Sequence, residues 1–106
     1  MHEEIILGTE CKVKVKLPEI SNVSPYVYDF EIEIYTNPNK RLVVSKDHCF
    51  PTEGEGYFFL VPFDSSKVGV GEITIEVVAH VEDAMFLDDG KRTERFRIES
   101  VGTIIP

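Results

Sequence analysis

The sequence predicts one all-β domain, an antiparallel two-sheet sandwich of the immunoglobulin-like kind with about seven strands. Three observations favour this class. Apolar and polar residues alternate with a period of two along much of the chain, turn residues separate the alternating runs, and no segment sustains the period of a helix. The length of 106 residues suits a single domain over residues 1–106 and is enough to bury one core.

Four strands are expected in the first half of the chain. The third is the clearest, because aromatic and isoleucine side chains share one phase while three acids share the other. In the second, three lysines occupy the outward phase, where they should be solvated or paired across strands. The turn Asn37-Pro38-Asn39 then separates the third strand from the fourth. The four expected ranges are 3–7, 11–17, 28–35 and 41–46.

Three further strands are expected after a loop at 47–56. The run 57–61 is apolar on both phases, which predicts a central strand that Pro62 either ends or leaves at a sheet edge. The longest expected strand covers 72–82. The last main strand, 92–99, should pair with it and place its arginines near the outward side chains of that neighbour.

Turn chemistry links these strands. Gly69 and Gly71 are expected to adopt backbone conformations that a side chain would resist. The pair Asp89 and Gly90 predicts a tight turn before the last strand. Asp64 is placed to cap one helical or 3₁₀ turn.

The composition argues against several classes of partner. Nineteen acids outweigh 11 bases, for a net charge of −8. Nucleic acids and anionic membranes are bound chiefly through lysine and arginine, so neither is an expected partner. No apolar run approaches membrane-spanning length, and the acidic start of the chain does not resemble a signal peptide. A cytoplasmic location during synthesis is therefore expected.

The two cysteines do not make a disulfide framework, so both thiols are expected to be free. Cys11 shares the inward phase of its strand, which predicts a buried thiol. Cys49 lies in a loop before Pro51, which predicts that it is the more reactive of the two.

An acidic cluster after the longest strand is the best candidate for a metal site, because calcium prefers carboxylate oxygens. Its spacing does not match a calcium-binding loop, and the apolar residues 85–87 interrupt it. A solvated loop is the favoured interpretation. The four residues of the cluster are Glu82, Asp83, Asp88 and Asp89.

Histidines and paired carboxylates provide no clear catalytic set. His48 is adjacent to Cys49, but a zinc site needs a second pair of ligands, and neither His2 nor His80 belongs to one. Neighbouring residues on an extended backbone point apart, so His48 is not placed to activate Cys49. Carboxylate pairs that a glycosidase could use are expected on any acidic strand face. These pairs are Glu31 with Glu33 and Glu72 with Glu76. We therefore expect no catalytic residue, no metal and no cofactor.

A family resemblance rests on two runs in the second half of the chain. They are Val68-Gly69-Val70-Gly71-Glu72-Ile73 and the run from Val81 to Glu94, and Tyr28-Asp29-Phe30 with Tyr35-Thr36 adds to the match. Together they resemble small β-sandwich proteins of tailed-phage and prophage structural modules. They are also similar to the immunoglobulin-like N-terminal domain of phage baseplate upper proteins, which usually continue into a longer chain. The resemblance covers roughly residues 26–99.

The resemblance implies a non-enzymatic structural or adaptor module of a phage-like tail, baseplate or other virion assembly. Its partners would be other protein subunits, and it would work in a bacterial cytoplasm or in the virion. The family has no catalytic residues to carry over. The alternative is a carbohydrate- or peptide-binding sandwich, which would use aromatic residues near strand ends. The candidates are Tyr26, Tyr28 and Tyr35.

The apolar run 101–106 is a candidate interaction segment, because a free tail in water is normally polar. Two interpretations remain open. The segment could lie on its own sheet as an extra strand, or it could pair with a neighbouring chain in self-association. The side chains concerned are Val101, Ile104 and Ile105.

Overall fold

The computed structural model describes residues 3–54, 56–86, 89–98 and 101–106. Strands account for most of the regular structure in these residues. The helical elements there are two 3₁₀ turns of three residues each, η1 (Lys46–His48) and η2 (Ser65–Lys67). The all-β prediction is confirmed. The long runs of alternating residues leave no amphipathic helical stripe, so the chain can bury its apolar side chains only by pairing strands.

Ten strands in the described residues form three sheets, with the orders β4-β3-β8-β9, β2-β6-β5 and β1-β10-β7. All pairs within them are antiparallel except β1 with β10, which is parallel. The bounds of the strands are β1 Glu4–Ile6, β2 Glu10–Lys16, β3 Asp29–Asn37, β4 Lys40–Ser45, β5 Phe50–Pro51, β6 Phe58–Asp64, β7 Gly71–Glu72, β8 Thr74–Glu82, β9 Lys91–Ile98 and β10 Thr103–Ile105.

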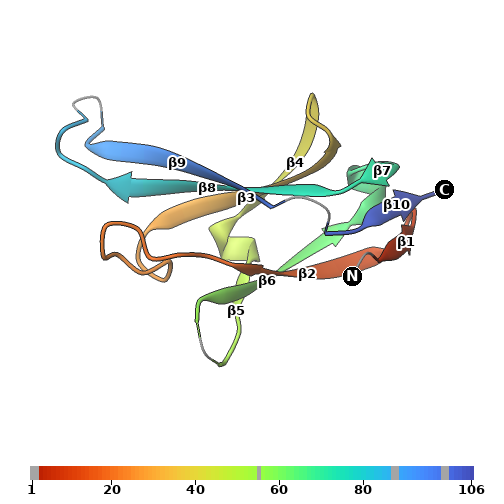
Figure 1. Cartoon of the computed structure of the whole chain (residues 1–106), viewed down its shortest axis with the longest axis horizontal. Helices are drawn as coiled ribbons and strands as arrows, with labels where there is room; N and C mark the ends of the chain where they lie inside the picture. Colours follow the sequence, from red (N-terminus) through yellow and green to blue (C-terminus); the bar gives the residue numbers. More distant parts are fainter. Residues whose placement is uncertain (1–2, 55, 87–88, 99–100) are drawn as a thin grey trace.

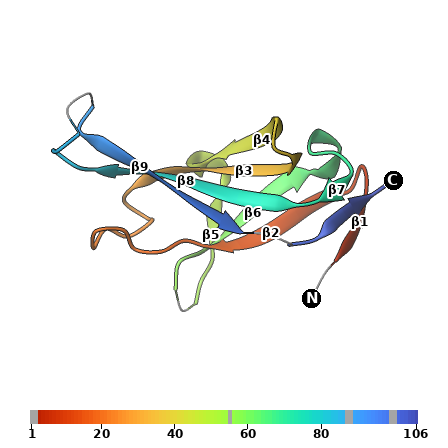
Figure 2. The same ribbon diagram turned by 45° about the horizontal axis from the view of Figure 1, so that its top comes forward.

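The four-stranded sheet lies over the β2-β6-β5 sheet, and the small β1-β10-β7 sheet lies at one end of the two layers (Figures 1 and 2). The buried apolar side chains of both large sheets form one core cluster. The inward phase of each strand supplies them, as the alternation predicts. The largest fully buried ones include Leu17 of the segment after β2, Phe30, Ile32 and Ile34 of β3, Val61 of β6 and Ile75 and Val77 of β8.

All seven expected strands are present, with changed limits. Two short strands, β5 and β7, were not expected as separate elements, and β10 is the extra strand of the first of the two interpretations left open for 101–106. The range 72–82 divides into β7 and β8 at Ile73, whose backbone N–H donates to the carbonyl of Gly102 (2.8 Å). The segment around β7 is thereby turned toward β10. The pairing of β8 with β9 sets Arg97 opposite Glu76, as the sequence predicts for the two longest strands.

Pro62 does not end its strand, because β6 continues to Asp64. Hydrogen bonds from Leu17 N to Tyr57 O (2.8 Å) and from Ser65 N to Thr9 O (3.0 Å) show which β6 residues bond to β2. By alternation, Pro62 would point an N–H away from β2. On that far side β5 reaches only Phe59 and Leu60 in the register. The missing donor of Pro62 therefore lies at an edge, which is the second of the two expected outcomes.

The turn residues adopt the conformations that the sequence suggests. Gly69, Gly71 and Gly90 have φ values of 99°, 134° and 69°. A Cβ atom on Gly71 would lie 3.2 Å from Cβ of Thr36, so both dihedral and space favour glycine there. The carboxylate of Asp89 accepts from Lys91 N (2.9 Å) in the turn before β9. Asp64 caps η2, because its carboxylate accepts from the backbone N–H of Ser66 at 2.9 Å.

The C-terminal segment lies inside its own fold. β10 is the middle strand of its sheet, with Ile104 opposite Ile5 of β1 and Gly71 of β7. The side chain of Ile104 is fully buried, whereas Val101 and Ile105 are half-buried. The apolar run therefore covers the end of the core as an internal strand, with both of its edges paired.

Candidate functional site

The acidic cluster expected as a metal candidate is not assembled as a site in the described residues. Asp83 accepts from Met85 N (3.1 Å) and lies 3.5 Å from a guanidinium nitrogen of Arg92. Asp89 is occupied by its turn hydrogen bond, and Asp88 lies outside the described residues. Across the described part of the chain, no group of three or more metal-ligating side chains could hold an ion. The carboxylates of Asp83 and Asp89 organise the loop between β8 and β9.

The histidines lie apart and make local hydrogen bonds. His48 Nδ1 is 3.0 Å from Ser45 Oγ, at the exposed 3₁₀ turn η1. His80 of β8 lies between Thr93 Oγ1 (3.2 Å) and a carboxylate oxygen of Glu31 (3.4 Å). His2 lies outside the described residues. Each described histidine thus contacts one hydroxyl, and the two histidines lie on different elements, η1 and β8.

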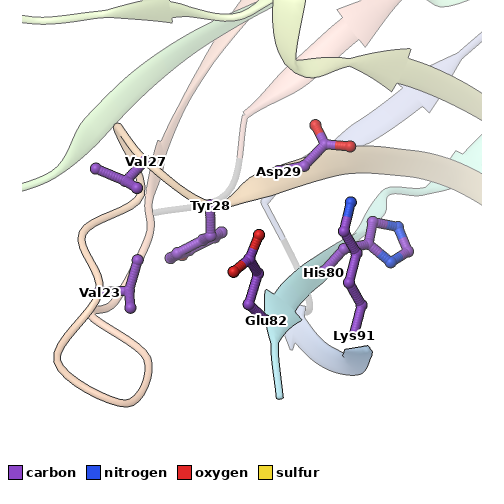
Figure 3. A pocket seen from close by; sticks show the side chains of 7 residues that line it. All are labelled: Val23, Val27, Tyr28, Asp29, His80, Glu82 and Lys91. Carbon is purple, nitrogen blue, oxygen red and sulfur yellow. The ribbon is translucent and has the colours of Figure 1, made fainter. Parts of the chain in front are cut away.

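A hollow of about 240 Å³ lies where the loop before β3 meets the ends of β8 and β9 (Figure 3). His80 and Lys91 lie side by side in it, Glu82 projects toward Tyr28, and Val23 and Val27 line the opposite side. The hydroxyl of Tyr28 donates to the carbonyl of Pro18 (2.9 Å), and burial raises its pKa to about 12. The phenol is therefore neutral at physiological pH and fixed as a donor, so it is not available to act as a base.

A buried carboxylate lies on the outer face of the four-stranded sheet. Glu76 of β8 is 6% exposed, and its carboxylate accepts from Arg41 (2.7 Å), Arg95 (3.1 Å) and the Tyr35 hydroxyl (3.3 Å). Arg41 also bridges to Glu33 at 2.9 Å. Burial raises the pKa of Glu76, but the hydrogen bonds and the positive charges outweigh this and hold the pKa below its ordinary value.

In the described part of the chain, the hydrogen-bond partners of the Glu76 carboxylate are side chains of the same sheet, so the network links β3, β4, β8 and β9. The carboxylate pair of Glu72 and Glu76 that the sequence suggests on one strand face does not form, since Glu72 is exposed on β7, a separate strand. Glu31 and Glu33 are also divided, one beside His80 and one beside Arg41. Burial of Glu76 was missed because its outward phase on an acidic strand looks solvated. The arginines of the expected strand 92–99, which should lie near its outward side chain, were the available signal in the sequence.

The three tyrosines expected to bind a ligand do not form an exposed patch. Tyr28 is 4% exposed and Tyr35 is 5% exposed. Tyr26 is half-exposed, and its ring packs edge-on against the ring of Tyr57 with centroids 5.2 Å apart. An exposed patch of these tyrosines would favour the alternative of a carbohydrate- or peptide-binding sandwich, and two of the three residues are buried instead. Tyr28, just before β3, packs in the core. Tyr35 lies on the outer face of β3, where its hydroxyl donates to Glu76 and the guanidinium of Arg41 lies 4.2 Å from the centre of its ring.

The free edge of β2 is the feature best suited to binding. In the described residues, β2 pairs with β6 on one side and with no strand on the other. Its outward side chains Lys12, Lys14 and Lys16 are exposed. An unpaired edge of this length offers a row of backbone donors and acceptors to any extended chain.

A pocket of about 280 Å³ adjoins this edge, lined mainly by apolar residues and also by Glu3 and Thr9. Cys11 and Val13 of β2 line it together with Lys12, so the pocket reaches the open edge. On its other sides lie residues of the β1 region, β6 and the segments that flank β7 and β10. The apolar residues that line it are Ile5, Cys11, Val13, Phe63, Ile73 and Val101. Val101, expected as part of an interaction segment, thus belongs to the wall of the pocket. Ile104 lies on β10, the middle strand of the β1-β10-β7 sheet, and its side chain is buried.

The cysteines are both free, but their exposure is the reverse of what was expected. Cys49 is 6% exposed, because η1 folds it back so that its N–H donates to Lys46 O (3.0 Å). Burial raises the pKa of its thiol to about 11. Cys11 is half-buried in the pocket, and burial followed by the charges of Asp64 and Glu3 raises its pKa.

Native-state labelling with a maleimide is therefore expected to modify Cys11 well before Cys49. Both thiols should react more slowly than a free cysteine, because a raised pKa leaves little thiolate at neutral pH. Mass spectrometry of tryptic peptides after timed labelling measures the order. The Cys11→Ser chain should label slowly and the Cys49→Ser chain should keep the faster phase. Faster labelling of Cys49 in the folded protein would contradict this burial order.

Comparison of the chain with protein-family models, with curated proteins and with solved structures finds no match. In the part of the chain that the structure describes, no helix is both long and apolar enough to cross a membrane.

Proposed function

We propose that this chain is a non-enzymatic structural or adaptor module that binds another protein subunit within a phage-like assembly. The observation that supports protein binding is the unpaired edge of β2 beside an apolar pocket. Strand addition to such an edge is a recurrent way of joining protein subunits. The phage-like setting, whether tail, baseplate or another part of a virion, is supported by the sequence resemblance alone.

The order of the strands supports an immunoglobulin-like arrangement as part of this proposal. The hairpins β3–β4 and β8–β9 lie side by side in one sheet, opposite β2, β6 and β5. This resembles the distribution of strands in variable-type immunoglobulin domains, whose larger sheet has one further strand. The parallel pairing of β1 with β10 places the first strand beside the last. Among the described residues no strand pairs with the outer edge of β2, which is the edge proposed to bind.

A peptide-binding role for the sandwich is the second candidate, and the same edge of β2 supports it. A carbohydrate-binding role has less support, because two of the three candidate tyrosines, Tyr28 and Tyr35, are buried and Tyr26 alone of the three is exposed. The two candidates differ in their partner. An assembly module binds one subunit permanently, whereas a peptide-binding module releases its ligand.

Purified particles test the proposed assembly role. In phage-producing cells that encode this chain, an epitope-tagged copy is expected to sediment with the particles on a density gradient. The matched control is a tagged cytosolic enzyme of similar mass, which should remain at the top of the gradient. Quantitative mass spectrometry then measures copies per particle. If the tagged chain stays with the control at every stage of particle production, the proposal is wrong.

A further inference from the structure

We propose that the open edge of β2 takes up an acidic extended segment of a partner protein as an added strand. Carboxylates of this segment would face Lys12, Lys14 and Lys16, and its alternate apolar side chains would enter the adjoining pocket. The inference rests on the proposed protein-binding function and specifies the chemistry of the partner. It is carried by three features of the described residues: backbone orientation, charge and the pocket.

The backbone N–H and C=O groups of the three β2 lysines point to the open side of the strand, away from β6. The bonds from Leu17 N to Tyr57 O (2.8 Å) and from Ser65 N to Thr9 O (3.0 Å) fix the ladder with β6. Odd-numbered residues of β2 therefore bond to β6. In an antiparallel ladder the alternate residues point their N–H and C=O groups the other way. Lys12, Lys14 and Lys16 thus offer three donors and three acceptors along an edge of about 13 Å.

The side chains of the same residues form a positive stripe on an acidic chain of net charge −8. Their cross-strand neighbours on β6 are Pro62, Leu60 and Phe58, none of which is acidic. Within the described residues no ion pair neutralises these lysines. The ammonium groups of Lys14 and Lys16 instead lie 4.7 and 5.7 Å from the centre of the Phe58 ring. The stripe favours a strand that places carboxylates directly opposite.

The same charges disfavour a second copy of β2 as the occupant. Antiparallel pairing of two β2 edges would place lysine beside lysine, and like charges directly opposite destabilise a sheet. The overall negative charge of the chain also opposes a nucleic acid along this edge. An acidic extended segment would pair its carboxylates with the lysines and its peptide groups with the open backbone groups of β2. Charge therefore selects the partner, and the strand edge determines its extended conformation.

The pocket accounts for the other face of the added strand. Side chains alternate across a strand, so residues between the carboxylates point toward the inward phase of β2, where Cys11 and Val13 line the pocket. Its volume of about 280 Å³ accepts aliphatic side chains. Apolar burial there adds affinity that the exposed ion pairs do not provide, since ion pairs in water contribute little.

A synthetic peptide tests this inference on the purified full chain. The probe is a fluorescein-labelled seven-residue peptide in which glutamate and valine alternate, and its match replaces each glutamate with lysine. Fluorescence anisotropy should show binding of the acidic peptide at least about tenfold tighter than binding of the lysine peptide. Methylation of the backbone nitrogens that face β2 should abolish binding, because strand pairing needs those donors.

Charge-reversed chains provide the matched controls. The variant K12E/K14E/K16E is expected to lose at least about tenfold in affinity for the acidic peptide. The variant K40E/K67E/K91E changes the net charge equally at exposed lysines elsewhere, and it should lose no more than about threefold. Circular dichroism checks that both variants keep the strand spectrum. Equal losses in the two variants would show a general charge effect and overturn the proposal.

Hydrogen exchange locates the peptide. The amides of Lys12, Lys14 and Lys16 should exchange rapidly in the free chain and slow at least about tenfold when the acidic peptide binds. The amides of Val13 and Val15, bonded to β6, should be slow throughout. Unchanged exchange at the lysines would overturn the proposal. Protection of these amides that rises with protein concentration alone would also overturn it, because a second copy would then be the occupant. So would an oligonucleotide that competes with the acidic peptide as strongly as the unlabelled peptide does. None of these results depends on particle sedimentation, so the assembly role is tested separately.

Discussion

Replacement of Ile104 by alanine is expected to lower the free energy of unfolding by about 2–4 kcal/mol. Ile104 is fully buried at the centre of the β1-β10-β7 sheet, where it lies opposite Ile5 and Gly71. Its truncation removes apolar contacts and leaves a cavity that paired strands on both sides cannot fill. Urea denaturation followed by circular dichroism measures the change. The loss should come from stability alone, with no change in mass by light scattering.

The neighbouring residue provides the control. Ile105 is half-buried opposite Ile6, so the Ile105→Ala chain should lose less than about 1.5 kcal/mol. If Ile104→Ala is as stable as the parent and instead lowers the mass of an oligomer, the segment acts between chains. That outcome would contradict the internal position of β10.

Removal of the Glu76 carboxylate is expected to lower the free energy of unfolding by about 1–3 kcal/mol in the Glu76→Ala chain. The carboxylate joins Arg41, Arg95 and Tyr35 across three strands, and its loss leaves the Tyr35 hydroxyl and the arginines without their shared acceptor. Water screens the partly exposed arginines, which keeps the expected loss moderate. Thermal and urea unfolding measure it. The exposed Glu72→Ala control should change stability by less than about 0.5 kcal/mol.

The same carboxylate predicts a pH dependence. The folded pKa of Glu76 lies below its ordinary value of 4.5, so its contribution is complete above that value. It is lost as the pH falls from 4.5 through the folded pKa, because the unfolded chain takes up the proton first. Melting curves from about pH 7 to about pH 3 should show a smaller acid loss in Glu76→Gln than in the parent. Equal acid losses would contradict the role of the buried carboxylate.

Alternation along the sequence predicts most strands and the phase of their core residues. Phe30, Ile32 and Ile34 are buried as their phase requires, because successive side chains on a strand point to opposite faces. The turn at Asp89 and Gly90 and the Asp64 cap can also be predicted from the sequence, since each depends on a few neighbouring residues. Such features are local, because the interactions that determine them join residues that are close in the sequence.

Alternation along the sequence predicts the exposure of individual side chains less well. Cys49 was expected in an open loop, but η1 turns it into the core, while Cys11 lies at the end of a strand beside a pocket. Glu76 has the outward phase of a solvated residue, yet side chains from β3, β4 and β9 cover it. Both cases depend on segments that are distant in the sequence, which alternation does not relate.

The sequence by itself determined the class of the fold, seven of the strands and several turns of this protein, because backbone conformation and side-chain phase there follow from neighbouring residues. It also placed three lysines on one face of the second strand. Only the tertiary structure decided that this strand has an open edge, that a pocket adjoins it and that the apolar run 101–106 lies between β1 and β7. Strand order is the physical reason: which edges pair and which stay free depends on contacts between distant segments, formed as the sheets bury a shared core.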